Sequence, residues 1–391
     1  MLAGVMLLAA AAQVVLASKD PVYSIRVQPP RRIALKWEDR CALLNDRQFF
    51  ARYRMTKEDF AELVDKCRPY LSLSNKARED SVTPEIAVSI TLRYLAGGQY
   101  CDICDVHNIR DSTFFSVKSR TLIALNKALV DEIRFPANDE ERRHVAAGFE
   151  EKSHGIMKGC IGALDGLAVA IKRPTAADCP NPASYRNRKD FYSVSVQAIC
   201  DSNRLFIFTS VKCQGSCHDA TAFATTAFYN SIGTRVPAPF WVSADDAYGC
   251  SETVVTPYPG SYGSGTKEDG FNFWQSGAQR IYIECAFGIL VRRWGVLWRP
   301  LENSLRENTL IIDVCMKLHN YCSRRNLPES RCTEAGEIDA QGAEPIVYFQ
   351  DELHTEDVTG RRRDLERSHR REALANALFE SGMRRPSISR S

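Results

Sequence analysis

A strand–turn–strand pattern near the middle of the chain constrains the fold more than any other feature. The segment FYSVSVQAICDSNRLFIFTSVKC (Phe191–Cys213) has two apolar runs on either side of the turn residues Asp201-Ser202-Asn203, which predicts a β-hairpin. A further strand is predicted just before it, in KGCIGALDGLAVAIKRP (Lys158–Pro174), where Asp165-Gly166 interrupts the apolar run.

The elements predicted after the hairpin extend this sheet. HDATAFATTAFYNSI (His218–Ile232) predicts a helix, and PFWVSADDAY (Pro239–Tyr248) predicts a short strand that runs into two acids. A loop rich in Gly, Pro and Ser covers roughly residues 257–270, and two helices are predicted after it, in residues 278–298 and 307–321. Three antiparallel strands followed by a helix, a strand and further helices predict an α/β fold with a mixed sheet.

The segment before the sheet has the spacing of helices. Within Trp37–Val130, one helix is predicted to end at Gly97-Gly98 and a short helix follows it. After a turn near Asn108, another helix begins, capped by Asp111 or Ser112. Two helices joined by a tight turn fit a DNA-binding helix-turn-helix, and ordinary packing of helices produces the same pattern. Spacing alone leaves both interpretations open.

Charge is unevenly distributed along the 391 residues. The whole chain carries a formal net charge of only +3, so its total charge does not indicate a nucleic-acid binder. Residues 331–360 hold one basic and eight acidic residues, whereas residues 361–391 hold nine basic and four acidic residues. An acidic stretch followed by a basic tail predicts a solvated, flexible C-terminal region over 326–391.

The first 20 residues, MLAGVMLLAAAAQVVLASKD, contain an uncharged apolar run from Leu2 to Ala17. This run is short for a membrane span, which needs about 20 residues. It suits the apolar part of a signal peptide, although no Lys or Arg precedes it. The alternatives are a buried helix and an extension from a misplaced start codon.

The fourteen cysteines are scattered, without the compact framework of small secreted domains. One C-x-x-C, Cys101 and Cys104, has His107 nearby, but a second ligand pair for zinc is missing. Buried reduced thiols are expected for the cysteines inside apolar runs, which are Cys160, Cys200, Cys285 and Cys315.

Three segments contain carboxylates at unusual places. Asp165 interrupts an apolar strand, where an unpaired charge is costly unless it lies at a strand end or in a site. Asp245 and Asp246 directly follow a strand, and the carboxyl ends of strands are where α/β sheets build their sites. Glu284 lies in the predicted helix AQRIYIECAFGILVRRWGVLW (Ala278–Trp298). A salt bridge, a helix cap or a solvated end is the simpler explanation for each acid alone.

The helix around Glu284 has one apolar stripe, with Glu284 at its edge. Gly288 and Gly295 follow Glu284 on its own face, which predicts that something packs closely there. Basic residues beside an acid cluster fit a substrate that bears phosphate. Three acids from two strands and a helix would hold divalent metal ions by oxygen ligation. The stripe consists of Ile283, Phe287, Leu290, Trp294 and Leu297, and the basic residues are Arg280, Arg292 and Arg293.

Six short motifs follow one another between residues 162 and 322. They are GALDGLAVAIKRP, YRNRKDFYSVSVQAICD, GSCHDATAF, SADDAYG, FNFWQSGAQRIYIECAFGILVRRW and CMKLHNYC. Their order and spacing resemble those of the PIF/Harbinger superfamily of DDE transposases, which includes the harbinger transposase-derived nucleases. The resemblance covers roughly Lys57 to Cys322.

This resemblance implies an RNase H-like fold and a catalytic, metal-binding triad of Asp165, Asp245 and Glu284. Asp245 stands three residues before a Tyr, as in the family, although Ala244 replaces the usual Gly, and Asp246 is the second choice. The family's cofactors are two Mg²⁺ or Mn²⁺ ions. The pair His218-Asp219 is expected to support the site, with a helix cap at Asp219 as the alternative.

The resemblance also implies contacts with DNA, both transposon ends and target. Phosphate contacts are expected from the loop before the hairpin, and further positions that face DNA are expected from the helix-turn-helix in Ala96–Leu125. A separate Myb-like DNA-binding protein and a homo-oligomer are implied partners, with no membrane partner and a nuclear location. The expected DNA-contacting residues are Arg186, Arg188, Lys189, Arg280, Arg292, Arg293, Ser112, Thr113 and Lys118.

The sequence thus predicts an apolar N-terminal segment and extension (1–36), a helical domain with a helix-turn-helix-like region (37–135), an RNase H-like nuclease domain (155–325) and the C-terminal region (326–391). The predicted activity is metal-dependent cleavage of DNA phosphodiester bonds, with joining of strands. The alternative is a domesticated, catalytically silent module for binding DNA or protein. A secreted α/β hydrolase rests only on residues 1–20, and the chain has no G-x-S-x-G.

Overall fold

The computed structural model describes residues 36–71, 82–328 and 368–385, without the side chains of residues 276 and 278–281. The apolar N-terminal run and the acidic stretch 331–360 lie outside the described residues, so the signal-peptide interpretation stays a prediction. Within the described ranges, no helix is both long enough and apolar enough to span a membrane.

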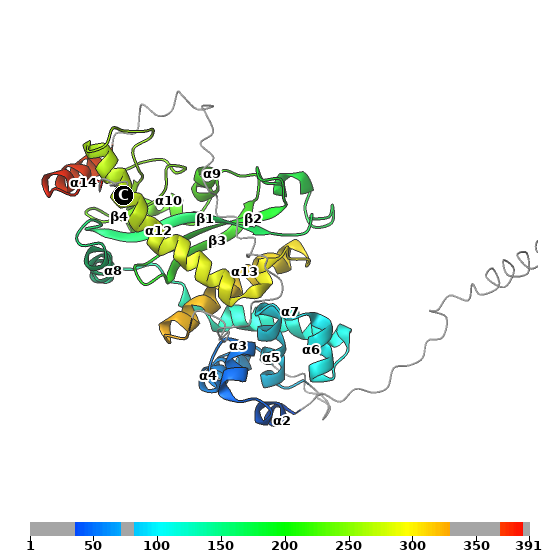
Figure 1. The fold of residues 1–391 in the computed structure, drawn as a ribbon. Helices are drawn as coiled ribbons and strands as arrows, with labels where there is room; N and C mark the ends of the chain where they lie inside the picture. Colours follow the sequence, from blue (N-terminus) through cyan, green and yellow to red (C-terminus); the bar gives the residue numbers. More distant parts are fainter. Residues whose placement is uncertain (1–35, 72–81, 329–367, 386–391) are drawn as a thin grey trace, which may run out of the picture. The chain divides into compact units, whose positions relative to one another are not determined.

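The centre of the fold is a mixed sheet of five strands in the order β3-β2-β1-β4-β5 (Figure 1). β1 pairs antiparallel with β2, and β2 pairs antiparallel with β3, whereas β1–β4 and β4–β5 are parallel. This confirms the predicted mixed α/β sheet flanked by helices. The strands are β1 (Cys160–Ala170), β2 (Ser193–Cys200), β3 (Phe206–Gln214), β4 (Trp241–Ser243) and β5 (Val254–Val255).

The predicted hairpin forms because Asp201 closes the turn between β2 and β3. Its Oδ1 accepts hydrogen bonds from the backbone N–H groups of Asn203 (2.8 Å) and Leu205 (2.9 Å). Arg204 takes the left-handed conformation, with φ of 63°. An Asp side chain that accepts backbone hydrogen bonds two residues on stabilises such a turn.

The helices α12 (Lys267–Arg293) and α13 (Leu305–Arg324) cover one face of the sheet. Val196 and Ala198 of β2 share a core with Phe287 and Leu290 of α12. The other face packs against shorter elements, in a second core that joins Ile199 to Phe223 and Phe228. The single helix predicted over His218–Ile232 is therefore three short helices, α9 (Asp219–Ala224), α10 (Ala227–Asn230) and α11 (Ile232–Arg235).

The segment before the sheet is helical, as the spacing predicted. Its core joins the core of the sheet, because buried residues of α3 and α4 belong to the same cluster as those of α12 and α13. The predicted cap by Asp111 or Ser112 is wrong, because the helix begins at Asp111, its N-cap position is Arg110, and no side chain caps it. The helices are α2 (Trp37–Ala42), α3 (Asp46–Tyr53), α4 (Lys57–Cys67), α5 (Pro84–Leu95), α6 (Tyr100–His107), α7 (Asp111–Ala128) and α8 (Asp139–Lys152), with 3-10 turns η1 (Arg68–Tyr70) and η2 (Val130–Glu132).

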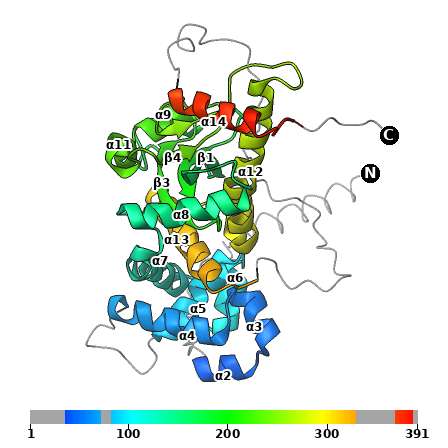
Figure 2. The same cartoon turned by 90° about the vertical axis from the view of Figure 1, so that its left-hand side faces the viewer.

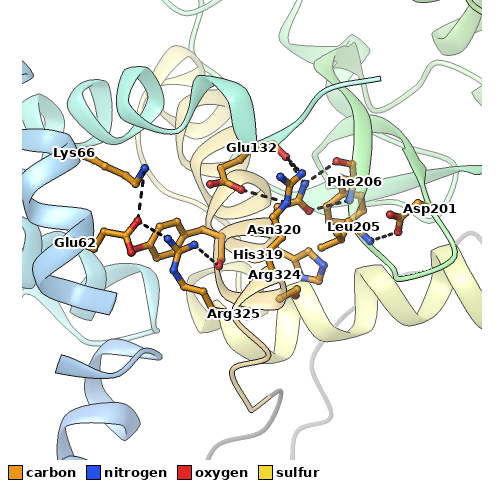
Figure 3. A network of polar contacts seen from close by, with 12 residues as sticks. Glu62, Lys66, Glu132, Asp201, Leu205, Phe206, His319, Asn320, Arg324 and Arg325 are labelled. Carbon is orange, nitrogen blue, oxygen red and sulfur yellow. Dashed lines mark hydrogen bonds and ion pairs between the residues drawn. The ribbon is translucent and has the colours of Figure 1, made fainter. Parts of the chain in front are cut away.

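Asn320 of α13 links the sheet to this helical segment (Figure 3). Its side chain accepts from the N–H of Phe206 at 2.9 Å and donates to the carbonyl of Phe206 at 2.7 Å. The same amide nitrogen donates to the carbonyl of Glu132 at 2.7 Å. Beside it, His319 contacts the carbonyl of Arg204 at 2.9 Å, and burial lowers the pKa of His319 to about 3. Asn320 of the motif CMKLHNYC therefore holds Phe206, the first residue of β3, in place by hydrogen bonds.

Part of the C-terminal region is ordered, although the charge pattern predicted flexibility for all of 326–391. Residues 369–380 form α14 (His369–Glu380), which lies against α12 (Figure 2). Ala375 and Leu378 are buried there, and Glu372 binds Tyr258 and Lys267, both at 2.7 Å. The sequence did not predict this helix, because charged residues surround its few apolar positions.

Candidate active site

Asp165 lies in the middle of β1, which continues through it without a break. Its strand partner is Ala198, whose side chain belongs to the core beneath α12 and α13. Residues directly opposite each other in an antiparallel pair share a face, so Asp165 points to the side of α12. It is half-buried, and its Oδ1 accepts a hydrogen bond from the Gly166 N–H at 2.6 Å.

Asp245 follows β4, the strand parallel to β1, with Ser243 paired to Ala163. The Asp245 Oδ1 accepts from the N–H of Ala247 at 3.1 Å, which holds the carboxylate over its own turn. Asp245 is half-buried and Asp246 is exposed. The pairing of β4 with β1 thus places Asp245 at about the same position along the strands as Asp165.

Glu284 is half-buried on α12, a helix of 27 residues that Thr266 caps. The position of α12 over the end of β4 is fixed by a residue that the sequence did not single out, Gln275. Its Nε2 lies 2.8 Å from Ser243 Oγ, 3.2 Å from the Ala244 carbonyl and 3.3 Å from the Val255 carbonyl. A polar Gln directly after the apolar residues Phe273 and Trp274 is the sequence signal that could have found it.

The acids are close enough to influence one another. Burial raises the pKa of Asp165 well above its usual range, the charge of Asp245 raises it further, and Asp219 and Glu284 add to the effect. A cluster of carboxylates that repel each other is relieved by a divalent cation, and Mg²⁺ prefers oxygen ligands. The donor set therefore fits Mg²⁺ or Mn²⁺ in kind. In the part of the chain that the structure describes, no three His, Cys, Asp or Glu side chains are arranged so that they could hold a metal ion together.

Replacement of Asp165 by Asn is expected to stabilise the metal-free chain near neutral pH. A group whose folded-state pKa is raised contributes stability below its unfolded pKa, near 3.9 for Asp, and loses it as the pH rises. The gain in melting midpoint of Asp165→Asn over the parent, measured in EDTA, should therefore be small at pH 4 and larger at pH 8. A gain that shrinks as the pH rises would contradict the mutual repulsion of these acids.

His218 and Asp219 differ in burial and in their contacts. Asp219 is buried, and burial raises its pKa, while the hydrogen bond from Gln197 Nε2 at 2.9 Å and the charge of Arg188 act in the opposite direction. His218 is exposed and precedes α9, but its side chain forms no cap. The helix-cap alternative for Asp219 is wrong, because Asp219 is the first residue of the helix.

The basic loop before the hairpin lies beside this pair. Arg188 and Lys189 line a small hollow together with Cys217 and His218. Arg188 is exposed and Lys189 half-buried, whereas Arg186 is exposed and ion-paired with Asp190 at 2.5 Å. A cavity of about 1200 Å³ between α8, the hairpin turn, α12 and α13 includes none of the acids.

Two of the predicted DNA-contacting cations are buried and cannot face DNA. Lys118, 1% exposed, binds Asn303 at 2.6 Å and Glu307 at 3.4 Å, because α13 packs over this side of α7. Arg293, 2% exposed, binds the carbonyls of His319 at 3.3 Å and Leu327 at 3.1 Å, at the end of α13. Of the others, Ser112 and Arg292 are exposed and Thr113 is half-buried, while the Arg280 side chain lies outside the described ones.

The glycines that follow Glu284 do not mark a close contact on its face. A side chain at Gly288 would meet nothing within 4 Å. Gly295 lies beyond the end of α12, in the 3-10 turn η4 (Gly295–Trp298), where Gly97 approaches it. Cys285, which we expected to be buried, is exposed because it lies on the side of α12 away from Ile283. The surface beside Glu284 is therefore open.

A mixed five-stranded sheet flanked by helices, with acids on β1, after β4 and on a helix across that face, defines an RNase H-like domain. Residues 164–320 match the family described as DDE superfamily endonuclease. These residues form a DDE superfamily endonuclease domain, and the chain is homologous to Harbinger transposase-derived nucleases.

The related proteins are distant in sequence. HARBI1 of Rattus norvegicus, named as a candidate nuclease, is 24% identical over 221 residues, which are 55% of this chain and 60% of the rat protein. HARBI1 of Homo sapiens is 24% identical over 292 residues, 71% of this chain and 78% of the human protein. The ALP1-like protein of Arabidopsis thaliana is 24% identical over 251 residues, 60% of this chain and 59% of that protein. The chain thus spans about 60% of the rat protein's length, and no solved structure matches it significantly.

Proposed function

We propose that this protein is a metal-dependent DNA endonuclease of the DDE type, which hydrolyses phosphodiester bonds and joins strands as a transposase does. The observation that carries the proposal is the placement of three acids by three separate elements, with Asp165 in β1, Asp245 after the parallel strand β4 and Glu284 on the helix α12. Burial and the neighbouring acids raise the pKa of Asp165, and a carboxyl with a raised pKa beside other acids is typical of functional sites. The nuclease names of HARBI1 relatives support the same conclusion.

In this proposal, Asp165, Asp245 and Glu284 would hold two divalent ions, Mg²⁺ or Mn²⁺. When bound, the ions stabilise the attacking and leaving oxygens of the phosphoryl transfer. The exposed Arg188 and the half-buried Lys189 hold the DNA backbone beside the acids, because charged donors bind phosphate oxygens well. The attacking group is water for cleavage and a DNA 3′-hydroxyl for joining.

The partners follow from the same proposal. DNA is the substrate, as transposon ends and as target. Ser112 and Thr113, at the start of α7, remain the candidates for contact with DNA from this helix, now without Lys118. A separate Myb-like DNA-binding protein, a homo-oligomer and a nuclear location complete the proposal.

Removal of metal is the first test. The purified chain is expected to nick supercoiled plasmid in Mg²⁺ or Mn²⁺ and to leave it intact in EDTA, because the acids repel the phosphate unless cations intervene. Conversion of supercoiled to open-circular DNA on agarose gels measures this. A folded chain that binds DNA without cleaving it in either metal would favour the catalytically silent module.

A further inference from the structure

Behind the acids, three buried polar side chains from three elements form a chain of hydrogen bonds. The Tyr248 hydroxyl donates to Gln197 Oε1 at 2.6 Å, and Gln197 Nε2 donates to Asp219 Oδ1 at 2.9 Å. Tyr248 is 4% exposed, Gln197 1% and Asp219 6%. Hydrogen bonds between buried groups are strong, and leaving one unmade is costly. The three elements are therefore held in one arrangement.

The chain of bonds begins in the turn that carries Asp245. The N–H of Tyr248 donates to the carbonyl of Asp245 at 3.3 Å, so the two residues open and close the same turn. The Tyr248 ring packs edge-on against Phe223, at 5.9 Å between ring centres, in the core on the far side of the sheet. Tyr248 thus anchors this turn on the face opposite α12.

The chain of bonds passes the residue next to Asp165. Gln197 of β2 is the strand partner of Gly166. A Cβ at Gly166 would lie 2.3 Å from Asp219 Oδ1 and 3.0 Å from Gln197 Nε2, so only glycine leaves room for the Asp219 carboxylate. Neighbouring residues in a strand point to opposite faces, so Asp219 lies behind the strand whose front carries Asp165.

We propose that Tyr248 and Gln197 are positioning residues of the candidate site, which hold the Asp245 turn at a fixed place relative to Asp165, with Asp219 as their buried anchor. The inference rests on the proposed function. It explains why a Gly follows Asp165 and why a Tyr stands three residues after Asp245. Groups behind metal ligands commonly change metal affinity by about 10- to 100-fold when they are replaced.

The test uses the full chain and Mn²⁺ alone as the probe, measured by isothermal titration calorimetry at neutral pH. Tyr248→Phe removes one hydroxyl and keeps the ring. Tyr321→Phe is the matched control, because Tyr321 is also buried and its hydroxyl donates to the Asp59 carbonyl at 2.8 Å, away from the acids. We expect Tyr248→Phe to weaken Mn²⁺ binding by about tenfold or more and Tyr321→Phe to leave it unchanged.

Further variants distinguish a positioning role from direct binding of the metal ion. Asp219→Asn can still accept the hydrogen bond from Gln197, so Mn²⁺ binding should stay within about threefold, whereas Asp165→Asn should abolish it. If Tyr248→Phe does not fold, Gln197→Glu is measured instead. This change replaces Gln197 Nε2, which donates to Asp219, with a carboxylate oxygen that cannot donate. We expect the same weakening.

Three results would overturn the inference alone: parent-like Mn²⁺ affinity in Tyr248→Phe, equal weakening in Tyr321→Phe, or a loss in Asp219→Asn as complete as in Asp165→Asn. If the parent chain binds no Mn²⁺, or if Asp165→Asn binds it as the parent does, the proposed function fails and the inference fails with it.

Discussion

Replacement of Glu284 by Gln is expected to reduce Mg²⁺-dependent DNA cleavage by at least about a hundredfold. The change removes one carboxylate charge and keeps the shape of the side chain. Metal ions contribute several kcal/mol to the stabilisation of phosphoryl transfer, so a site that loses a ligand loses most of its rate. The rate of plasmid nicking under excess enzyme measures the effect.

The control for this variant is Glu302→Gln, which removes an exposed carboxylate from the loop before α13. It should cleave as the parent does. Both variants should keep the parent's circular dichroism spectrum, because Glu284 is only half-buried and belongs to no apolar core. Unchanged nicking by Glu284→Gln would remove Glu284 from the proposed triad.

The second large effect is expected for stability, in Asn320→Ala. Asn320 is fully buried and satisfies both backbone groups of Phe206 and the carbonyl of Glu132 (Figure 3). A buried polar group that loses its partner costs about 1–3 kcal/mol, so the free energy of unfolding should fall by about 3–5 kcal/mol. Urea denaturation followed by fluorescence measures it.

Asn230→Ala is the matched control, because Asn230 is exposed at the end of α10. Exposed substitutions usually change stability by less than about 0.5 kcal/mol. If Asn320→Ala unfolds at the same urea concentration as this control, the amide does not hold β3 in place.

The sheet and its acids could be predicted because their signals are local. The turn at Asp201 lies between two apolar runs, and Asp165 stands out as a charge inside an apolar strand. Gln197 is the same kind of signal in β2, a polar residue in a fully buried strand, and a search for such residues would have found it. The resemblance to a known family placed the acids in order, which spacing alone did not.

The burial of Lys118 could not be predicted in this way. Its partners Asn303 and Glu307 lie about 190 residues further along the chain, and no local pattern shows that α13 covers that side of α7. Gly288 was misjudged for a related reason. A glycine in a helix indicates that a side chain is missing, but not whether a neighbour or solvent fills the space.

The docking of α14 has a practical consequence for fragments of this protein. Gly270 of α12 accommodates the backbone of Met383, since a Cβ there would lie 3.2 Å from the Met383 carbonyl oxygen. Arg385 binds Asp269 at 3.2 Å, and Tyr258 contacts both Glu372 and Arg371. A nuclease fragment cut after residue 325 would expose the apolar surface beneath α14 at the start of the helix that carries Glu284. Inactivity of such a truncated protein would therefore say nothing about the chemistry of its acids.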